Sequence, residues 1–343
     1  MAKRGKATDV KVGVIGYGGA FNMGKGHLNE MASAGMAPTA VCDLDAKRLR
    51  AAEKDFPGIE TYTSPAAMLK KSPVNLLAII TPHNTHAALA VQCLRAGRHV
   101  VVEKPFAITT TECDRMVAAA RKHRRLLSTY HNRHWDGCIL RAVKAVRAGD
   151  IGDVVRVEAH MGAWGAPRDW WRTSKSISGG ILYDWGVHLL EYTFQIIGAG
   201  IVEVAGFAKT GFWAAKSKWK ADTNEDEGFL VVRYDNGAWS SLRISHIESN
   251  PKPGQLEITG TKGSYVFDYK TYTLIRHRGG ATVTETGANP PSEHQKFYNN
   301  VAAHLTKGTA LVINPEWARR PVHVLDLAGR SAKAGKALPA RYK

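Results

Sequence analysis

One candidate catalytic residue is a lysine that directly follows a short apolar segment. Lys104 lies in Glu103-Lys104-Pro105, directly after His99-Val100-Val101-Val102. A lysine partly removed from water can have a lowered pKa, and it can polarise or deprotonate a hydroxyl group. The alternative is a structural ion pair with a carboxylate. We predict that Lys104 is catalytic.

A second candidate group lies in the other half of the chain. Asp184 and His188 are four residues apart, which places them on one face of a helix. A histidine paired with a carboxylate can shuttle a proton near neutral pH, although two such residues can also form a plain helix-surface pair. An aromatic and cationic segment, Trp170-Trp171-Arg172, precedes them and suits either a sugar ring, an anionic sugar or core packing. The predicted substrate-binding residues are Lys104, Arg133, Trp171, Arg172, Asp184 and His188.

A glycine-rich segment near the N-terminus suggests a dinucleotide site. Gly16 allows a tight turn, and Gly18 lets the backbone approach a pyrophosphate at a helix N-terminus. Phe21 stands where the motif usually has a third glycine, and Gly24 takes that role if residues 21–23 are an insertion. The alternative is a glycine-rich turn without a ligand.

Asp43, at the end of the second expected strand, bears on the choice of dinucleotide. Its carboxylate can accept hydrogen bonds from a ribose diol and would repel a 2′-phosphate, which favours NAD over NADP. Lys47 and Arg48 lie nearby and weaken that preference. The alternative interpretation is that Asp43 is a helix N-cap.

Further candidates follow two buried strands, and therefore lie at the carboxyl edge of the expected sheet, where ligands bind in open α/β folds. The predicted cofactor-binding residues are Gly16, Tyr17, Gly18, Gly19, Ala20, Phe21, Asp43, Arg48, Thr81, Pro82, His83, His86, Glu103, Lys104 and Asn132. We expect no metal site.

Strand and helix patterns alternate in the first part of the chain. The expected strands are 10–15, 39–43, 75–81, 99–103 and 126–130, and the expected helices are 24–34, 46–55, 87–96 and 110–124. Apolar strands that alternate with helices form a parallel sheet covered on both faces. We expect residues 1–131 to form a dinucleotide-binding Rossmann domain.

From residue 132 the pattern is that of an α/β domain with a large, mainly antiparallel open sheet. The expected strands are 154–160, 202–210, 227–234, 238–247, 255–259, 264–268 and 273–277, and the expected helices are 139–148, 183–197, 294–307 and 315–335. Asp235-Asn236-Gly237 predicts a hairpin turn. The lysine-rich segment 214–227 predicts an exposed loop. We expect residues 132–343 to form a second domain for substrate binding, whose C-terminal helix packs back on the first.

Composition narrows the function classes. The chain has 343 residues and a formal net charge of +17, but its basic residues are spread out, which argues against nucleic-acid binding. No apolar run is long enough to cross a bilayer. Four scattered cysteines, without a metal-ligand spacing, predict a reduced cytoplasmic protein with buried thiols.

The order of these motifs resembles the Gfo/Idh/MocA family of oxidoreductases. The resemblance is carried by Gly16-Tyr17-Gly18, Thr81-Pro82 with His86, Ala96-Gly97 with His99, Glu103-Lys104-Pro105, Asn132-Arg133, Gly149-Asp150-Ile151-Gly152, and Gly180 with Asp184, Gly186 and His188. The sequence departs from the family pattern at two places. His83 stands where the family often has asparagine, and the glycine-rich loop is lengthened by residues 21–23.

The resemblance implies hydride transfer between NAD(P) and a secondary hydroxyl of a sugar, polyol or sugar derivative. It also implies that Lys104, Asp184 and His188 meet the substrate beside the nicotinamide, and that the open sheet forms a homodimer or homotetramer. A lyase or glycoside-cleaving enzyme that cycles tightly bound NAD is the alternative, since the same residues would serve it. A non-catalytic NAD-binding regulator is a more distant one.

Overall fold

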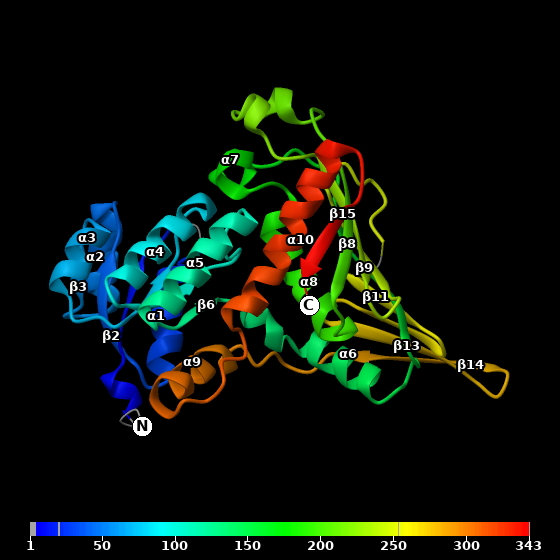
Figure 1. Cartoon of the computed structure of the whole chain (residues 1–343), viewed down its shortest axis with the longest axis horizontal. Helices are drawn as coiled ribbons and strands as arrows, with labels where there is room; N and C mark the ends of the chain where they lie inside the picture. Colours follow the sequence, from blue (N-terminus) through cyan, green and yellow to red (C-terminus); the bar gives the residue numbers. More distant parts are fainter. Residues whose placement is uncertain (1–4, 20, 253, 343) are drawn as a thin grey trace. The chain divides into compact units, whose positions relative to one another are not determined.

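The chain forms two compact units. The computed structural model describes residues 5–19, 21–252 and 254–342. Unit 1 comprises the described residues up to Asn132 together with Gln295–Arg319, and unit 2 comprises Arg133–His294 and the described residues from Arg320 onward (Figure 1). The chain therefore passes between the units three times, and each unit is described by itself below.

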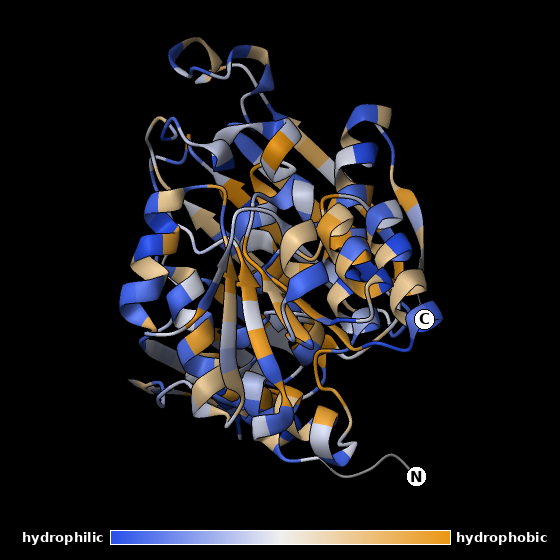
Figure 2. Ribbon diagram, turned by 90° about the vertical axis from the view of Figure 1, so that its left-hand side faces the viewer, coloured by the Kyte–Doolittle hydropathy of each residue, from blue (hydrophilic) through white to orange (hydrophobic). Residues whose placement is uncertain are grey.

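Unit 1 contains a six-stranded, wholly parallel sheet of order β3-β2-β1-β4-β5-β6. Its strands are β1 (Lys11–Ile15), β2 (Ala37–Cys42), β3 (Glu60–Tyr62), β4 (Leu76–Ile79), β5 (His99–Val102) and β6 (Leu127–Thr129). Most side chains of β1, β4 and β5 are buried. In Figure 2 the strands carry hydrophobic (orange) segments, whereas the helices carry many hydrophilic (blue) ones. This strand order, with its reversal between β1 and β4, is that of a Rossmann fold, which confirms the predicted class.

Along the chain, helices connect the successive parallel strands of unit 1, because parallel neighbours need a crossover connection. They are α1 (Met23–Ser33), α2 (Ala46–Asp55), α3 (Pro65–Lys71), α4 (His86–Arg95) and α5 (Thr110–His123); α9 (Lys296–Lys307) is added from later in the chain. The short β3 and α3 were not predicted. Asp45, whose carboxylate accepts from Lys47 N, is the N-cap of α2, so the interpretation of Asp43 as that cap is wrong.

Unit 2 is built on a nine-stranded sheet of order β14-β13-β12-β11-β7-β10-β9-β8-β15. Its strands are β7 (Val154–Gly162), β8 (Ile201–Lys209), β9 (Glu227–Tyr234), β10 (Trp239–Ser245), β11 (Leu256–Gly260), β12 (Gly263–Phe267), β13 (Thr271–Arg278), β14 (Ala281–Ala288) and β15 (Leu338–Tyr342). Every pairing is antiparallel except that of β7 with β10, which confirms the predicted sheet type. The strands β14 and β15 were not predicted.

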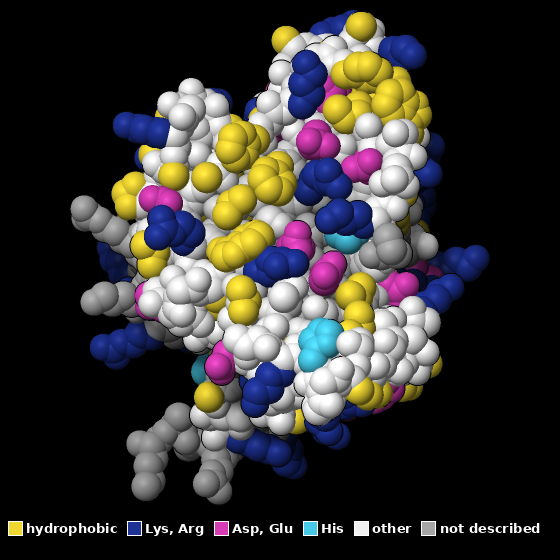
Figure 3. Space-filling model, turned by 90° about the vertical axis from the view of Figure 1, so that its right-hand side faces the viewer, with side chains coloured by type: hydrophobic (Ala, Val, Ile, Leu, Met, Phe, Trp, Pro, Cys, Tyr) yellow, Lys and Arg dark blue, Asp and Glu magenta, His cyan; other side chains and the backbone are white. Residues whose placement is uncertain are grey.

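One face of this sheet is covered by a helix. The helices of unit 2 are α6 (Gly137–Arg147), α7 (Lys175–Ser178) and α8 (Leu182–Ile197), and α10 (Pro315–Ala334) begins in unit 1 and continues into unit 2. α8 packs on β7 and β10, and a Cβ added to Gly186 would lie 3.1 Å from Leu242 Cδ2, so glycine permits this close approach. The opposite face exposes apolar side chains, among them Phe207 and Trp239. Figure 3 shows apolar and charged side chains together on one side of the molecule.

Several smaller predictions can be compared directly. The turn at 235–237 joins β9 to β10 as expected. The segment 214–227 is not a uniformly exposed loop, because it contains two 3-10 turns and Ser217, Thr223 and Asp226 are buried. All four cysteines are free and buried, as predicted. In the described part of the chain no helix is both long enough and apolar enough to cross a membrane.

Candidate active site

The glycine loop follows β1 and leads into α1. Gly16 and Gly18 adopt positive φ angles of 92° and 74°, and a Cβ added at Gly18 would meet nothing within 4 Å. A Cβ at Gly24, by contrast, would lie 2.6 Å from backbone atoms of Tyr17. The loop therefore has open space over Gly18 for the close approach of a ligand, and Gly24 provides the tight helix–loop packing of a third motif glycine. These features fit a dinucleotide pyrophosphate.

Asp43 and Arg48 both border this loop. The Asp43 carboxylate accepts from Tyr17 N at 2.8 Å and Gly18 N at 3.4 Å through one oxygen, and from Asp45 N at 2.9 Å through the other. Arg48 lies against Gly19, where an added Cβ would be 2.2 Å from Nη2. A carboxylate and a guanidinium thus both lie at the glycine loop, which is where Rossmann folds contact the adenosine ribose of the dinucleotide.

The other predicted loop residues differ in their surroundings. The Tyr17 hydroxyl donates to Asp55, which also pairs with Lys25, so this side chain joins the loop to α2 and leaves the loop backbone for a ligand. Burial and Asp55 raise the pKa of Tyr17. Phe21 is 58% exposed. Ala20 lies outside the described residues.

The loops that follow β4 and β5 are held together by a histidine. His86 is fully buried, with Nδ1 2.8 Å from the carbonyl oxygen of Pro105 and Nε2 2.9 Å from that of Thr81. The hydroxyls of Thr81 and Thr85 lie 2.6 Å apart. Of the remaining predicted residues here, Pro82 is half-buried and His83 is buried, with its ring centroid 5.7 Å from that of His86. His86 thus acts inside the protein as a tie between two loops.

Glu103 and Lys104 follow β5 at the same edge of the sheet. The backbone N–H of Lys104 donates to Glu103 Oε2 at 2.9 Å, and His27 Nε2 lies 3.0 Å from Glu103 Oε1. Burial opposes ionisation of Glu103, but the hydrogen bond from His27 and the charge of Lys104 hold the pKa of this carboxyl below its usual range. A permanent carboxylate therefore lies next to the candidate catalytic lysine.

In unit 2, α8 carries Asp184 and His188 on one face. His188 is buried, so the alternative of a helix-surface pair does not hold for it. Arg172 Nε lies 3.7 Å from Asp184 Oδ1, and its guanidinium carbon lies 4.9 Å from the Trp170 ring centroid and 4.5 Å from that of Trp171. Asp184 thus lies beside a cation that two aromatic rings hold in place.

Arg133 occupies a similar setting. Its guanidinium carbon lies 4.9 Å from the ring centroid of Trp185 and 5.0 Å from that of Tyr269, and Nη1 donates to Asp136 at 3.0 Å. The Trp185 ring is itself 5.7 Å from that of His188. Since the Arg133 side chain is still 29% exposed, it is a fixed, partly accessible cation. Asn132, the last residue of this part of unit 1, is half-buried.

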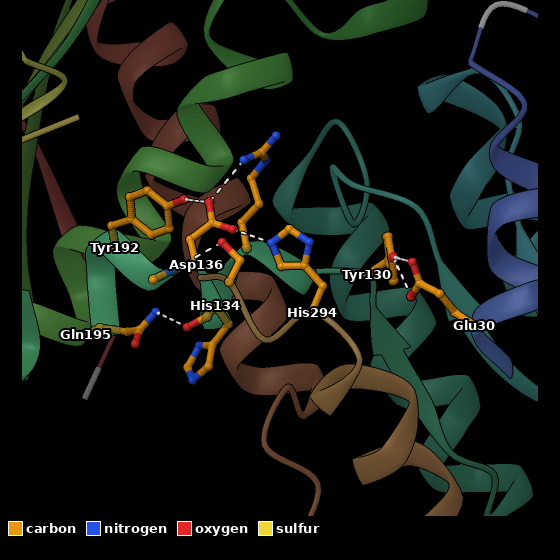
Figure 4. Close-up of polar contacts among 10 residues, drawn as sticks. Glu30, Tyr130, His134, Asp136, Tyr192, Gln195 and His294 are labelled. Atoms are coloured by element: carbon orange, nitrogen blue, oxygen red, sulfur yellow. Dashed lines mark hydrogen bonds and ion pairs between the residues drawn. The ribbon is translucent and has the colours of Figure 1, made fainter. Parts of the chain in front are cut away.

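The support for Arg133 was not predicted. Asp136 is buried and also accepts from the Tyr192 hydroxyl and from His294 Nε2, as Figure 4 shows. Burial opposes ionisation, yet these hydrogen bonds and Arg133 keep the pKa of Asp136 low. Glu225, which accepts from Ile181 N at the start of α8 and pairs with Lys175, was missed as well. Asp136 is three residues from Arg133, but its partners Tyr192 and His294, and the contact of Glu225 with Ile181, span 44 to 158 positions, and no local pattern identifies them.

The folds of unit 1 and unit 2 define a class: an NAD(P)-binding Rossmann domain followed in the chain by an α/β domain with a mainly antiparallel sheet. Models of known families agree. A model described as "Oxidoreductase family, NAD-binding Rossmann fold" matches residues 10–131, and a model of the Gfo/Idh/MocA C-terminal domain matches residues 139–266. The chain belongs to the Gfo/Idh/MocA oxidoreductase family.

Relatives are found along the whole chain. The scyllo-inositol 2-dehydrogenase (NADP(+)) IolW of Bacillus subtilis is 25% identical, with 96% of each chain covered. The myo-inositol 2-dehydrogenase of Thermotoga maritima is 27% identical over 78% of this chain and 77% of its own. A levoglucosan dehydrogenase, solved in complex with NADH and levoglucosan, shares the fold with a TM-score of 0.83 at 18% identity, covering 97% of this chain and 100% of its own.

Proposed function

We propose that this protein is an NAD-dependent dehydrogenase that oxidises a secondary hydroxyl of a sugar, polyol or sugar derivative. The observation that carries the proposal is that the protein has two regions suited to this reaction, one for the cofactor and one for proton transfer. One is a glycine loop with open space above Gly18, which follows β1 of the same parallel sheet in which the Lys104 loop follows β5, and the other is an acid–base helix face with Asp184 and His188. Family membership and the inositol dehydrogenases among its relatives support the substrate class.

In the proposed mechanism the bound nicotinamide supplies a hydride acceptor, and the protein handles the proton. His188 accepts the hydroxyl proton, and Asp184 supports the charge that its imidazole gains. Lys104 stabilises the negative charge that develops on the same oxygen. The roles of Lys104 and His188 can be exchanged without changing the overall reaction. Arg133 and Arg172, each fixed against aromatic rings, orient substrate oxygens.

The proposed cofactor preference is NAD over NADP. The Asp43 carboxylate lies at the end of β2 and already contacts the glycine loop, where it can accept from a ribose diol and repel a 2′-phosphate. Arg48 provides an opposing attraction for a phosphate because it lies against Gly19. We therefore expect measurable but weaker use of NADP.

The function is tested with purified protein, NAD and a panel of sugars, polyols and sugar acids, by following NADH absorbance. Net NADH formation with at least one member of the panel is expected. Product without net NADH would instead mean a cycling enzyme and would overturn the dehydrogenase assignment. Lys122→Met is the control for Lys104→Met, since Lys122 is an exposed lysine of unit 1.

We further propose that the exposed sheet face of unit 2 mediates a homodimer or homotetramer. The apolar side chains Phe207 and Phe229 lie in register on neighbouring strands, with ring centroids 5.9 Å apart, and Phe207 is 60% exposed. Light scattering should show more than one chain per particle, and Phe207→Glu should lower that mass. An unchanged mass, or a monomeric wild-type protein, would exclude this face as the interface.

A further inference from the structure

A hydrogen-bonded chain of side chains ends at the loop that carries Lys104. His27 on α1 lies with Nε2 3.0 Å from Glu103 Oε1 and with Nδ1 2.5 Å from the Tyr298 hydroxyl on α9. Glu103 Oε2 accepts the backbone N–H of Lys104. All four residues belong to unit 1, and His27 and Tyr298 are buried.

The direction of the hydrogen bonds along this chain can be derived. Glu103 is held as a carboxylate, which only accepts hydrogen bonds, so His27 donates through Nε2. Burial and the carboxylates of Glu30 and Glu103 raise the pKa of Tyr298 far above its usual range, so its hydroxyl keeps its proton and stays a hydrogen-bonding partner of His27 Nδ1. Glu103 thus accepts from both His27 Nε2 and the Lys104 N–H, and Tyr298 contacts the other nitrogen of the same imidazole.

We propose that Tyr298 and His27 are positioning residues, which hold the Glu103 carboxylate so that Lys104 keeps one orientation at the end of β5. This inference rests on the proposed function, in which Lys104 acts on the substrate hydroxyl. Neither Tyr298 nor His27 is placed in contact with the substrate. They act through Glu103 and the peptide group of Lys104.

The surroundings favour positioning over a purely stabilising role. The His27 ring packs 4.2 Å from that of Tyr130, and Tyr130 packs against Phe297 and Tyr298, so the imidazole has little freedom to turn. His86 holds the other flank of the loop through Pro105. A buried polar chain is weak evidence for stability, because apolar side chains of the same volume often stabilise a core as well. Fixing both neighbours of a reactive lysine is what precise catalytic geometry requires.

The chain offers a matched control for the test. Tyr130 has a buried ring in the same aromatic cluster, but its hydroxyl donates to Glu30, at 2.6 and 2.7 Å from the two carboxylate oxygens (Figure 4). Tyr298→Phe and Tyr130→Phe remove the same atom from the same cluster. Only Tyr298→Phe breaks the chain that leads to Lys104.

The first measurement is steady-state kinetics of the full-length enzyme with NAD and its best substrate. Loss of one buried hydrogen bond corresponds to about a tenfold effect. We expect Tyr298→Phe to lower kcat about tenfold with KM for NAD unchanged, and Tyr130→Phe to leave kcat within about twofold of wild type. Equal effects of the two variants, or an unchanged kcat in Tyr298→Phe, would overturn the proposal.

The second measurement does not depend on turnover. Amide hydrogen exchange of the full chain should be faster in the Glu103–Ile108 segment of Tyr298→Phe than in that of Tyr130→Phe, while the β1 segment exchanges equally in both. Glu103→Gln, which keeps the side-chain size, should accelerate the same segment if Tyr298→Phe is poorly folded. Equal exchange in all variants would refute the positioning role. Full activity of Lys104→Met, in contrast, would refute the proposed function and leave the exchange result valid.

Discussion

The two regions that carry the candidate active-site residues are held by different kinds of contact. In unit 1, the loops after β1, β4 and β5 are tied through backbone groups, such as the carbonyls of Thr81 and Pro105 that contact His86. In unit 2, the residues around α8 are held by side-chain ion pairs and by aromatic rings stacked on Arg133 and Arg172.

This difference has a functional consequence. Contacts to backbone groups at the carboxyl edge of a parallel sheet follow from the sheet topology. They suit the binding of a cofactor, because the same cofactor takes part in the reaction with every substrate. Side-chain contacts can be replaced one at a time without disturbing a sheet, so they suit the recognition of a particular substrate. We therefore expect variants of the residues that support the unit 1 loops to change the use of cofactor and the rate, and variants of the residues that support Arg133 and Arg172 in unit 2 to change substrate binding and local stability.

The largest expected effect comes from removing the proton-transfer groups. Lys104→Met and His188→Ala should each lower kcat about a thousandfold, because positioned acid–base groups contribute on that order. NADH binding, measured by its fluorescence, should remain in both variants. If either variant turned over at the wild-type rate, that residue would have no catalytic role, while Lys122→Met should behave as wild type.

A smaller effect is expected when the support of Arg133 is removed. Asp136→Ala leaves Arg133, Tyr192 and His294 without a shared acceptor, and breaking a buried pair costs about 3 kcal/mol. All tryptophans except Trp317 lie in unit 2, so urea unfolding followed by tryptophan fluorescence should report this loss. Asp150→Asn, which alters a partly exposed ion pair with Arg276, should cost less than about 1 kcal/mol. Equal midpoints for the two variants would contradict the central role of Asp136.

The pH dependence of stability should reveal the half-buried His99 in unit 1. Burial, with Arg125 and His304 nearby, lowers the pKa of His99 to about 4, and its Nδ1 accepts from Leu126 N. The unfolded chain binds the proton first, so this contribution is complete above about pH 6.5 and is lost as the pH falls toward 4, by about 2 kcal/mol. His99→Asn keeps an acceptor and should flatten the unfolding free energy over this range. The exposed His277→Asn serves as its control, and identical pH curves for wild type and His99→Asn would refute the assignment.

The smallest expected effect concerns the choice of cofactor. Asp43→Ser should lower kcat/KM for NAD and raise it for NADP, shifting their ratio about tenfold, because a repulsive carboxylate is removed. Arg48→Ala should shift the ratio in the opposite direction by lowering NADP use. The ratio is obtained from initial rates with each dinucleotide at a fixed substrate concentration. An unchanged ratio in Asp43→Ser would show that this carboxylate does not select the cofactor.

Most of unit 1 could be predicted because its information is local. The glycine loop, the strands after which Thr81 and Glu103 occur, and the caps of the helices each depend on residues a few positions apart. The short β3 and α3 were missed since three to seven residues carry little periodicity. In unit 2 the last strand, β15, was missed because pairing with β8, over 130 residues earlier, is what defines it.

The sequence by itself determined most of the order of the elements and the two fold types, and it supplied the candidates for acid–base chemistry, since apolar periodicity and loop glycines act over short distances. Only the tertiary structure decided which partners fix those residues. Tyr298 reaches His27 across 271 positions, and His294 reaches Asp136 across 158. The physical reason is that a buried polar group must find a partner in space, and chain folding, which no local pattern encodes, supplies it.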